Sequence, residues 1–485
     1  MPIRFGTDGW RAVISEEFTF DNVRRVAQAI AHFLRNVTDS SDPGGIARDP
    51  IAVVGFDTRF LSDRYAIEVS RVLAGNGITV YLARSDAPTP ALSLAVKHLK
   101  ADGGVMITAS HNPPRYSGIK LKAAYGGSAS LEDCRRVETY TESMHELNMM
   151  DFEAAHSRGL IRRFDAEQPY LAHLDTLLDR AIVAARPGRL VIDPMYGAGR
   201  GYVARWLAGT GWETIEIRSD LNPGFGGVHP EPIRKNLDVT VEALAAANAA
   251  SPGNPAFAVV TDGDADRVGA IDEHGAFIDP HRIFALALLY LVEKRGWRGS
   301  VVKTVSTTLM IDRICRKYDL TVHETPVGFN YIADRMMSED VLIGGEESGG
   351  ISIKGHIPEG DGILFGALLA EIVAWRGATL HDLVTDLQAT YGPAHYARRD
   401  LRLKRPVSKK DMAAKLASSA PASIAGTGVR LVSDLDGVKY LLADDSWLLI
   451  RPSGTEPVLR VYAESSDAGM VDALLSYGEA IAQAT

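Results

Sequence analysis

Cysteine is scarce in this chain, with only Cys134 and Cys315 among its 485 residues. Two cysteines cannot form a disulfide framework, nor a zinc site by themselves, so the sequence favours a reducing compartment. Long apolar runs are also missing, because the longest, residues 283–292, is far shorter than the ~20 residues that span a bilayer. Residues 1–6 show neither the charged leader nor the apolar core of a signal peptide. We therefore expect a cytoplasmic protein with no membrane partner.

Positive charge is not in excess either. The formal net charge is −9, which argues against nucleic acid as a partner, since a phosphate backbone is bound by many basic side chains. A small phosphorylated ligand needs only local positive charge and stays possible. The composition, 46% hydrophobic and 23% charged, is ordinary for a globular protein and excludes wholesale disorder.

One pattern occurs three times, within residues 51–81, 190–217 and 301–322: an apolar strand, a polar or glycine-rich turn, an amphipathic helix and a second apolar strand. Each repeat reads as a βαβ crossover in a parallel or mixed sheet covered by helices. Beyond about residue 395, strand signals follow one another before a final helix, which is typical of a small α+β domain.

We therefore predict an α/β fold of four domains, in line with the roughly three or four that typical domain sizes allow for this length. Three similar α/β domains with mixed sheets are expected at residues 1–163, 164–275 and 276–393, and a smaller C-terminal α+β domain at residues 394–485.

The loop at residues 108–113 (TASHNP) places a serine directly after the apolar run 104–107. The run reads as a buried strand, and Pro113 and Pro114 prevent a regular helix or central strand immediately after it. Ser110 is therefore expected at the carboxyl end of a strand, where parallel sheets bind ligands. No hydrolase elbow of the Gly-x-Ser-x-Gly kind surrounds it. Taken alone, the loop fits a polar turn as well as a reactive site.

The loop at residues 261–267 (TDGDADR) carries three carboxylates at alternate positions: Asp262, Asp264 and Asp266. Such oxygen ligands suit Mg²⁺ or Ca²⁺. An EF-hand loop is an alternative, but its sixth position requires glycine and here holds Arg267, and the flanks are strand-like. A solvated acidic turn is the other alternative, although three carboxylates so close repel one another without a cation.

Three more loops contain glycine beside polar side chains. Residues 344–350 (GGEESGG) let backbone approach a ligand, and Glu346 and Ser348 could bind sugar hydroxyls. Residues 451–457 (RPSGTEP) combine a guanidinium, hydroxyls and backbone N–H groups into a cradle suited to a phosphate dianion. Residues 5–11 (FGTDGWR) offer a glycine-flanked arginine. Each alone also fits a plain turn.

Taken together and in this order, the motifs at residues 108–113, 262–267, 345–349 and 451–457 resemble those of the α-D-phosphohexomutase family. They span nearly the whole chain, one in each predicted domain. The resemblance implies three similar α/β domains and a smaller fourth around a central cleft. It also implies an isomerase that moves a phosphoryl group reversibly between the 1- and 6-positions of a hexose phosphate, through a phosphoserine and a bound hexose 1,6-bisphosphate.

The resemblance implies that Ser110 is the phosphoserine. Asp262, Asp264 and Asp266 would then hold Mg²⁺, with an oxygen of Ser110 or its phosphate as a further ligand. Phosphoryl transfer depends on charge neutralisation and in-line positioning, which a bound Mg²⁺ supplies.

Four further residues receive catalytic roles from the resemblance. Arg267 and Arg11 would stabilise the transferring phosphoryl group. Lys120 is the candidate general acid/base, provided that burial or neighbouring cations lower its pKa. His111 is a second candidate, with loop orientation as its alternative role.

The resemblance also implies how a substrate is held. Glu346 and Ser348 would bind ring hydroxyls, and residues 325–331 (TPVGFNY), with Gly328, look like the sugar-specificity loop. The non-reacting phosphate would be held by four residues of the last loop: Arg451, Ser453, Gly454 and Thr455.

The Gly-Phe-x-aromatic pattern of the specificity loop resembles phosphoglucomutases, so we expect glucose 1-phosphate and glucose 6-phosphate as substrates and glucose 1,6-bisphosphate as activator. Asn330 stands where phosphoglucomutases commonly have lysine, and Lys303 or His356 are candidates to compensate. Phosphomannomutase and phosphoglucosamine mutase are the near alternatives. A metal-dependent sugar phosphatase and a non-catalytic sugar-phosphate sensor are the remote ones. The expected partner is a small hexose phosphate, and the chain could be a monomer or a dimer.

Overall fold

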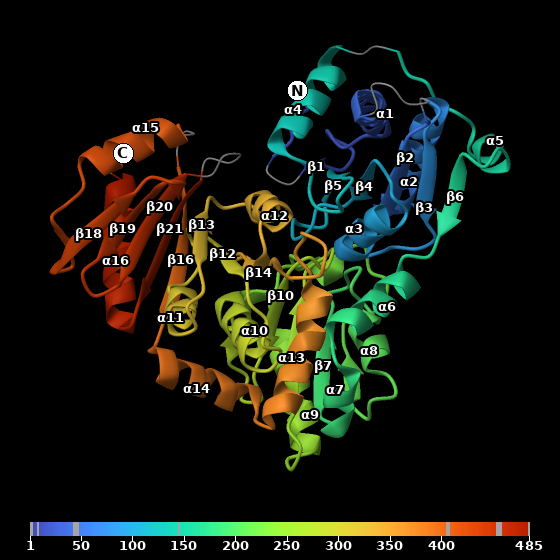
Figure 1. The fold of residues 1–485 in the computed structure, drawn as a ribbon. Helices are drawn as coiled ribbons and strands as arrows, with labels where there is room; N and C mark the ends of the chain where they lie inside the picture. Colours follow the sequence, from blue (N-terminus) through green and yellow to red (C-terminus); the bar gives the residue numbers. More distant parts are fainter. Residues whose placement is uncertain are drawn as a thin grey trace. The chain divides into compact units, whose positions relative to one another are not determined.

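The computed structural model describes residues 3–6, 9–41, 48–143, 146–403, 408–452 and 458–483. The chain, drawn as a ribbon in Figure 1, divides into two compact units. Unit 1 comprises Met1–Ile283 and Ser348–His381, and unit 2 comprises Phe284–Glu347 and Asp382–Thr485. Each unit is described by itself.

Unit 1 begins with a six-stranded mixed sheet, in the order β1-β5-β4-β2-β3-β6. Strands β2, β3, β4 and β6 are parallel, and β5 and β1 add antiparallel strands beside β4. The elements of this region are β1 (Trp10–Val13), α1 (Phe20–Ser41), β2 (Ile51–Phe56), α2 (Ser62–Gly75), β3 (Thr79–Ala83), α3 (Thr89–His98), β4 (Gly103–Ile107), β5 (Tyr116–Ala123), α4 (Leu131–Ser143), α5 (Phe152–Ser157) and β6 (Ile161–Phe164).

Helices cover both faces of this sheet because its central strands are apolar on both faces. Val54 belongs to the core that contains α1 and α2, whereas its neighbour Val53 packs with Leu92 and Val96 of α3. Successive side chains of a strand point to opposite faces, so an uninterrupted apolar strand needs a helical layer on each side. The helical layers leave the carboxyl ends of the parallel strands uncovered, and the loops after β2 and β4 start there.

The second sheet of unit 1 has the order β11-β10-β9-β7-β8, with β7, β8 and β9 parallel. Helix α9 packs on one face through Leu244, and α13 approaches the other face, where Gly366 lies against Val259. The elements here are α6 (Glu167–Leu177), α7 (Arg180–Ala185), β7 (Arg189–Asp193), α8 (Tyr202–Leu207), β8 (Glu213–Glu216), α9 (Asp238–Ala250), β9 (Phe257–Thr261), β10 (Val268–Ile271), β11 (Phe277–Ile278) and α13 (Gly362–Arg376). Strand β15 (Ile351–Ile353) precedes α13 in the chain and is not part of this sheet.

Unit 2 contains a parallel group of strands, in which β12 pairs with β13 on one side and β14 on the other. Val302 of β12 packs with Ile332 of α12. The elements of this part are α10 (Pro280–Glu293), β12 (Ser300–Thr304), α11 (Met310–Lys317), β13 (Val322–Thr325), α12 (Phe329–Ser338), β14 (Val341–Gly345) and α14 (Leu380–Tyr391). The first residues of α10 and of α14 still belong to unit 1.

The C-terminal part of unit 2 is a sheet in the order β16-β21-β20-β19-β18-β17, with antiparallel neighbours. Successive side chains of β20 point to opposite faces of the sheet. Leu448 and Ile450 pack into the core with α15 and α16, whereas Trp447 and Leu449 pack with Val305, which follows β12. Its elements are β16 (His395–Arg402), α15 (Lys409–Ser418), β17 (Ser423–Ile424), β18 (Thr427–Ser433), β19 (Val438–Leu442), β20 (Trp447–Pro452), β21 (Val458–Ser465) and α16 (Ala468–Gln483).

The predicted fold class, α/β with mixed sheets and a smaller C-terminal α+β domain, is confirmed. Among the helices that the structure describes, no single one is both long and apolar enough to cross a bilayer. Helices α13 and α14 reach that length and composition only as a bent pair, and α13 is almost entirely buried.

Candidate active site

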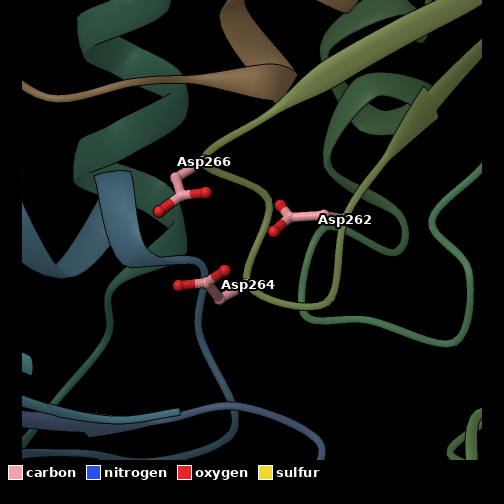
Figure 2. A group of neighbouring side chains, drawn as sticks. All are labelled: Asp262, Asp264 and Asp266. Carbon is pink, nitrogen blue, oxygen red and sulfur yellow. The ribbon is translucent and has the colours of Figure 1, made fainter. Parts of the chain in front are cut away.

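Three aspartates occupy the turn between β9 and β10 in unit 1. Asp262, Asp264 and Asp266 alternate along it, and one carboxylate oxygen from each lies within 4.8 Å of the others. Figure 2 shows the three side chains pointing into one space beside the loop. Ala265 has a left-handed backbone, φ +59°, which tightens the turn between the last two aspartates. All three aspartates are buried.

Ser110 lies just beyond the carboxyl end of β4, as the sequence predicts. Its Oγ donates to Asp262 Oδ2 at 2.8 Å. Its backbone is left-handed, φ +50°, and its N–H donates to Thr108 Oγ1 at 2.8 Å. The serine and aspartate loops touch, because a Cβ at Gly263 would lie 2.6 Å from the Ser110 carbonyl oxygen. Only glycine leaves room for that approach.

Lys120 reaches the same carboxylates from β5. Strand β5 runs antiparallel to β4 and places Lys120 opposite Met106. The Nζ of Lys120 lies 2.9 Å from Asp264 Oδ2 and 2.6 Å from Asp266 Oδ2, and the side chain is 1% exposed. A buried ammonium between two carboxylates offsets part of their mutual repulsion. The structure thus brings together the serine, the lysine and the three aspartates of the sequence prediction.

The two predicted arginines come from the aspartate loop and from strand β1. Arg267 directly follows the aspartates, and its N–H donates to Asp262 Oδ1 at 3.2 Å. Its Nε is 3.9 Å from Asp266 Oδ1. Arg11 lies on β1 and donates from Nη1 to Asn112 Oδ1 at 2.9 Å, which ties β1 to the serine loop.

His111 adjoins the serine in space as well as in sequence. Its Nδ1 lies 3.5 Å from Ser110 Oγ, at the outer limit of a hydrogen bond. Burial, and then the charges of Arg267, Arg11 and Lys120, hold the pKa of His111 well below its ordinary value. The imidazole is therefore neutral near pH 7.

Arg59 is a site residue that the sequence motifs did not reveal. Its buried guanidinium donates to four backbone carbonyl oxygens of residues 110–116 at 2.5–3.0 Å, including that of Ser110. It also pairs with Asp57, from Nε to Oδ2 at 3.1 Å. A sequence signal existed, because this Asp-x-Arg directly follows β2, and β2 neighbours β4. The ends of parallel neighbours meet at one sheet edge.

The aspartate centre fits a hard divalent cation. Oδ1 of Asp264 is buried and has no hydrogen-bond partner among the residues that the structure describes. Burial, and then the charges of Asp266 and Asp264, raise the pKa of Asp262 well above its ordinary value. A cation would remove that repulsion, and carboxylate oxygens are the ligands that Mg²⁺ prefers.

The predicted substrate-binding residues of unit 2 that the structure describes lie at the ends of strands or just after them. Strand β14 extends through Gly345, so the loop itself begins at Glu346. Glu346 Oε1 accepts from the N–H of Gly328 at 2.9 Å, which joins two of the predicted loops. Gly328 has φ +140°, a conformation that strains other residues.

Arg451 lies at the end of β20, and its Nε donates to Asp436 Oδ2 at 2.6 Å. Burial lowers the pKa of Arg451, but Asp436, Tyr462 and Glu347 together raise it by more, so the net change is upward. Three predicted phosphate-binding residues lie outside the described part of the chain: Ser453, Gly454 and Thr455. Ser348 belongs to unit 1 and is half-buried.

The residues considered as compensation for Asn330 have other partners. Lys303 Nζ contacts Asp312. The ring of His356 is hydrogen-bonded on both sides: its Nδ1 lies 3.0 Å from His173 Nε2, and its Nε2 lies 2.9 Å from Asp361 Oδ2. Asn330 itself is buried, with no hydrogen-bond partner for Oδ1 among the described residues.

Four domain families match the chain in sequence order, all described as phosphoglucomutase/phosphomannomutase. They are alpha/beta/alpha domain I at residues 2–148, domain II at 168–275, domain III at 279–391 and the C-terminal domain at 402–476. The chain belongs to the phosphoglucomutase/phosphomannomutase family. The predicted membership of the α-D-phosphohexomutases is confirmed, and the chain is an isomerase of this type, acting on hexose phosphates.

Individual relatives differ in the sugar that their names specify. A phosphoglucomutase/phosphomannomutase of Thermococcus kodakarensis is 31% identical over 95% of this chain and 94% of its own length. A phosphoglucosamine mutase of Clavibacter sepedonicus is 33% identical over 96% and 95%. A crystal structure of a candidate phosphomannomutase from Thermus thermophilus is 37% identical, with a TM-score of 0.85 and coverage of 100% and 99%. These likenesses support the reaction type and leave the sugar to be determined.

Proposed function

We propose that this chain is a phosphoglucomutase that interconverts glucose 1-phosphate and glucose 6-phosphate through a phosphoserine at Ser110. The observation that carries the proposal is the short contact from Ser110 Oγ to Asp262, within a buried centre that also holds Lys120. The Gly-Phe-x-aromatic pattern from Gly328 to Tyr331 supports glucose as the sugar. We keep domain boundaries near residues 163, 275 and 393 as part of the proposal.

The proposed reaction consists of two balanced transfers. In the first, the P–Oγ bond of phosphorylated Ser110 breaks while a new bond forms from phosphorus to the free hydroxyl of the hexose monophosphate. That hydroxyl releases its proton to a base, the Ser110 Oγ that the phosphoryl group leaves takes up a proton, and glucose 1,6-bisphosphate results. In the second, the phosphoryl group at the other position returns to Ser110 Oγ, which releases its proton to a base, and the sugar oxygen that the phosphoryl group leaves takes up a proton.

Lys120 and His111 are the proposed proton carriers. Lys120 lies among the carboxylates beside Ser110, and neutral His111 lies 3.5 Å from Ser110 Oγ. Arg267 and Arg11 supply positive charge to the phosphoryl oxygens as they pass between sugar and serine. Positioning and charge neutralisation account for most of the catalysis of such transfers.

The proposed metal is Mg²⁺. It would be held by the carboxylates of Asp262, Asp264 and Asp266 and by an oxygen of Ser110 or its phosphate. When bound, it neutralises phosphoryl charge and fixes the geometry of transfer. Binding of the sugar and of the non-reacting phosphate is proposed for Glu346, Ser348, Gly328 and the loop from Arg451, including Ser453, Gly454 and Thr455.

Replacing Ser110 with alanine tests the proposal directly. Ser110→Ala is expected to abolish turnover of glucose 1-phosphate, measured with Mg²⁺ and glucose 1,6-bisphosphate present. The control is Ser143→Ala, on the exposed end of α4, which is expected to keep wild-type activity. Undiminished activity of Ser110→Ala contradicts the proposal.

The sugar is tested by comparing kcat/KM for the 1-phosphates of glucose, mannose and glucosamine. The proposal expects the highest value for glucose, since this ratio reports differential transition-state binding. A preference for another sugar corrects the substrate and leaves the reaction type in place. Release of inorganic phosphate instead of glucose 6-phosphate points to a phosphatase, and tight binding without turnover points to a sensor.

A further inference from the structure

Two neighbouring backbone N–H groups of the specificity loop are held by carboxylates from different loops of unit 2. Gly328 N–H donates to Glu346 Oε1 at 2.9 Å. Val327 N–H donates to Asp436 Oδ2 at 3.1 Å. The loop is therefore fixed between the predicted sugar-binding residue and a residue of the C-terminal domain that no motif identifies.

The same oxygen of Asp436 also accepts from Arg451. The Nε of Arg451 lies 2.6 Å from Asp436 Oδ2. Both side chains are almost buried, 10% exposed for Asp436 and 6% for Arg451. A charged acceptor shared by a guanidinium and a backbone N–H in such a place makes strong, geometrically defined hydrogen bonds.

Local packing brings Asp436 to this position. It belongs to the turn between β18 and β19, and β19 pairs with β20, placing Val438 opposite Ile450. Gly437 has φ +90°, and a Cβ there would lie 2.4 Å from Ile450 O and 2.9 Å from the Arg451 Cα. Glycine lets the turn pack against the end of β20, where Arg451 lies.

Apolar contacts support the arrangement. Val327 packs against a cluster that contains Trp447, Leu449 and Tyr462 of the C-terminal sheet. The specificity loop is thus attached to the C-terminal domain by burial as well as by hydrogen bonds, and Asp436 provides the polar contact that sets its backbone position.

We propose that Asp436 is a positioning residue that fixes the specificity loop relative to Arg451, and so sets the spacing between sugar recognition at Glu346 and phosphate binding at Arg451. The spacing matters because a hexose phosphate must satisfy both sites at once, and sugars that differ at one ring position place their hydroxyls differently. This inference rests on the proposed function of these two loops.

Positioning and simple electrostatics predict opposite effects of removing Asp436. A carboxylate beside Arg451 weakens the attraction of that arginine for phosphate, so electrostatics alone predicts tighter phosphate binding without it. Positioning predicts weaker binding of the whole sugar phosphate, since the loop and the guanidinium lose a common anchor. The sign of the change in KM therefore separates the two.

The experiment compares Asp436→Ala, Asp436→Asn and the control Asp434→Asn, an exposed aspartate of the same turn. We expect Asp436→Ala to raise the KM for glucose 1-phosphate roughly tenfold or more, as loss of hydrogen bonds to a charged group implies, with a smaller change in kcat. It should also narrow the preference for glucose 1-phosphate over mannose 1-phosphate and glucosamine 1-phosphate. Asp436→Asn keeps an acceptor oxygen and is expected to fall between alanine and wild type.

A KM that falls or stays unchanged in Asp436→Ala, or an equal effect of Asp434→Asn, overturns the inference. Calorimetric binding of glucose 1-phosphate on the Ser110→Ala background repeats the comparison without turnover. If the wild-type protein interconverts no hexose phosphate, the proposed function fails. The binding comparison then still decides whether Asp436 positions the loop. Asp436→Asn preserves the shape of the side chain, so a folding defect in the alanine variant does not prevent the test.

Discussion

Ser110 occupies a conformation that its loop must hold in place. Ser110 has φ +50°, in the left-handed region. This conformation costs a non-glycine residue of order 1–3 kcal/mol, and it persists only where the surrounding structure holds it in place. Arg59 accounts for much of that constraint, because one guanidinium binds four carbonyl oxygens of the serine loop. The role of Arg59 depends on the planar, five-donor geometry of its side chain, which lysine lacks.

We predict that Arg59→Lys lowers kcat by about 10²-fold, the effect of a small misplacement of a reacting group. Charge is kept in this variant, so the loss reports positioning. Arg59→Met leaves Asp57 buried without its partner and is expected to lower the free energy of unfolding by about 3–5 kcal/mol. Steady-state kinetics and urea unfolding measure the two effects. Arg64→Lys, exposed on α2, is the control, and wild-type kcat in Arg59→Lys contradicts the prediction.

The aspartate centre gives a second prediction at the scale of single residues. Mg²⁺ added after chelation is expected to stabilise the substrate-free protein, by about 2.7 kcal/mol at roughly 100 times its Kd. Asp264→Asn should lose most of that gain, because its buried carboxylate is one of the three that converge. Thermal unfolding with and without Mg²⁺ measures this without activity. Asp238→Asn, exposed on α9, should respond as wild type, and an equal Mg²⁺ response in Asp264→Asn counts against the site.

Helices α6 and α13 are joined by a chain of titratable side chains within unit 1. Asp361 caps α13 by accepting from Leu364 N–H at 2.8 Å, and it also accepts from Tyr170 of α6. His356 links Asp361 to His173 of α6. The N-terminus of α13 lies close behind the aspartate loop, since Gly362 N–H donates to Ala265 O at 2.9 Å. Docking of α13 thus supports the loop that carries the aspartates.

This junction should make stability depend on pH. Burial, and then the neighbouring His356 and His98, lower the pKa of His173 to about 4. The unfolded histidine titrates near about 6.5, so between about pH 6.5 and about pH 4 the unfolded chain binds a proton that the native protein refuses. Stability therefore falls as the pH decreases through that range, by roughly 1–2 kcal/mol from this half-buried group.

Urea unfolding at about pH 7 and about pH 4.5 measures the effect. His173→Gln is expected to reduce the loss of stability between the two conditions. The exposed His229→Gln serves as the control and should follow wild type. Equal pH dependence in His173→Gln and wild type shows that His173 is not responsible.

At the scale of the whole molecule, the C-terminal sheet and the β12–β13–β14 strands belong to one compact unit. Glu464, 1% exposed, accepts from Leu309 N–H at 2.9 Å and from Trp447 Nε1 at 3.2 Å. Lys439 of β19 donates to Val305 O at 2.8 Å. Buried polar contacts of this kind are costly to break, so we expect the two parts to unfold together.

We predict that Glu464→Ala lowers the stability of unit 2 by about 2–4 kcal/mol, because a buried indole N–H and a part-buried backbone N–H lose their acceptor. Glu464→Gln keeps an acceptor oxygen and should stay within about 1 kcal/mol of wild type. Differential scanning calorimetry measures both variants. Two outcomes contradict the prediction. One is that the C-terminal sheet and the β12–β13–β14 strands of the wild-type protein unfold in separate calorimetric transitions. The other is that both variants lose the same amount of stability.

The sequence by itself determined the fold class and the family, and it predicts which loops carry chemistry, because these depend on local patterns of apolar runs, glycines and polar side chains. Strand β4 and the turn after β9 were both predicted from such patterns. The tertiary structure decided which groups meet: Ser110 contacts Asp262 across 152 positions of the chain. Strands that are neighbours in a sheet need not be neighbours in the sequence, so the separation of two residues along the chain does not predict their distance. These groups are buried together because whole layers of helices and strands pack around them. For the same reason the roles of Arg59 and Asp436, which lie outside every motif, followed only from the hydrogen-bond partners that the tertiary structure places around them.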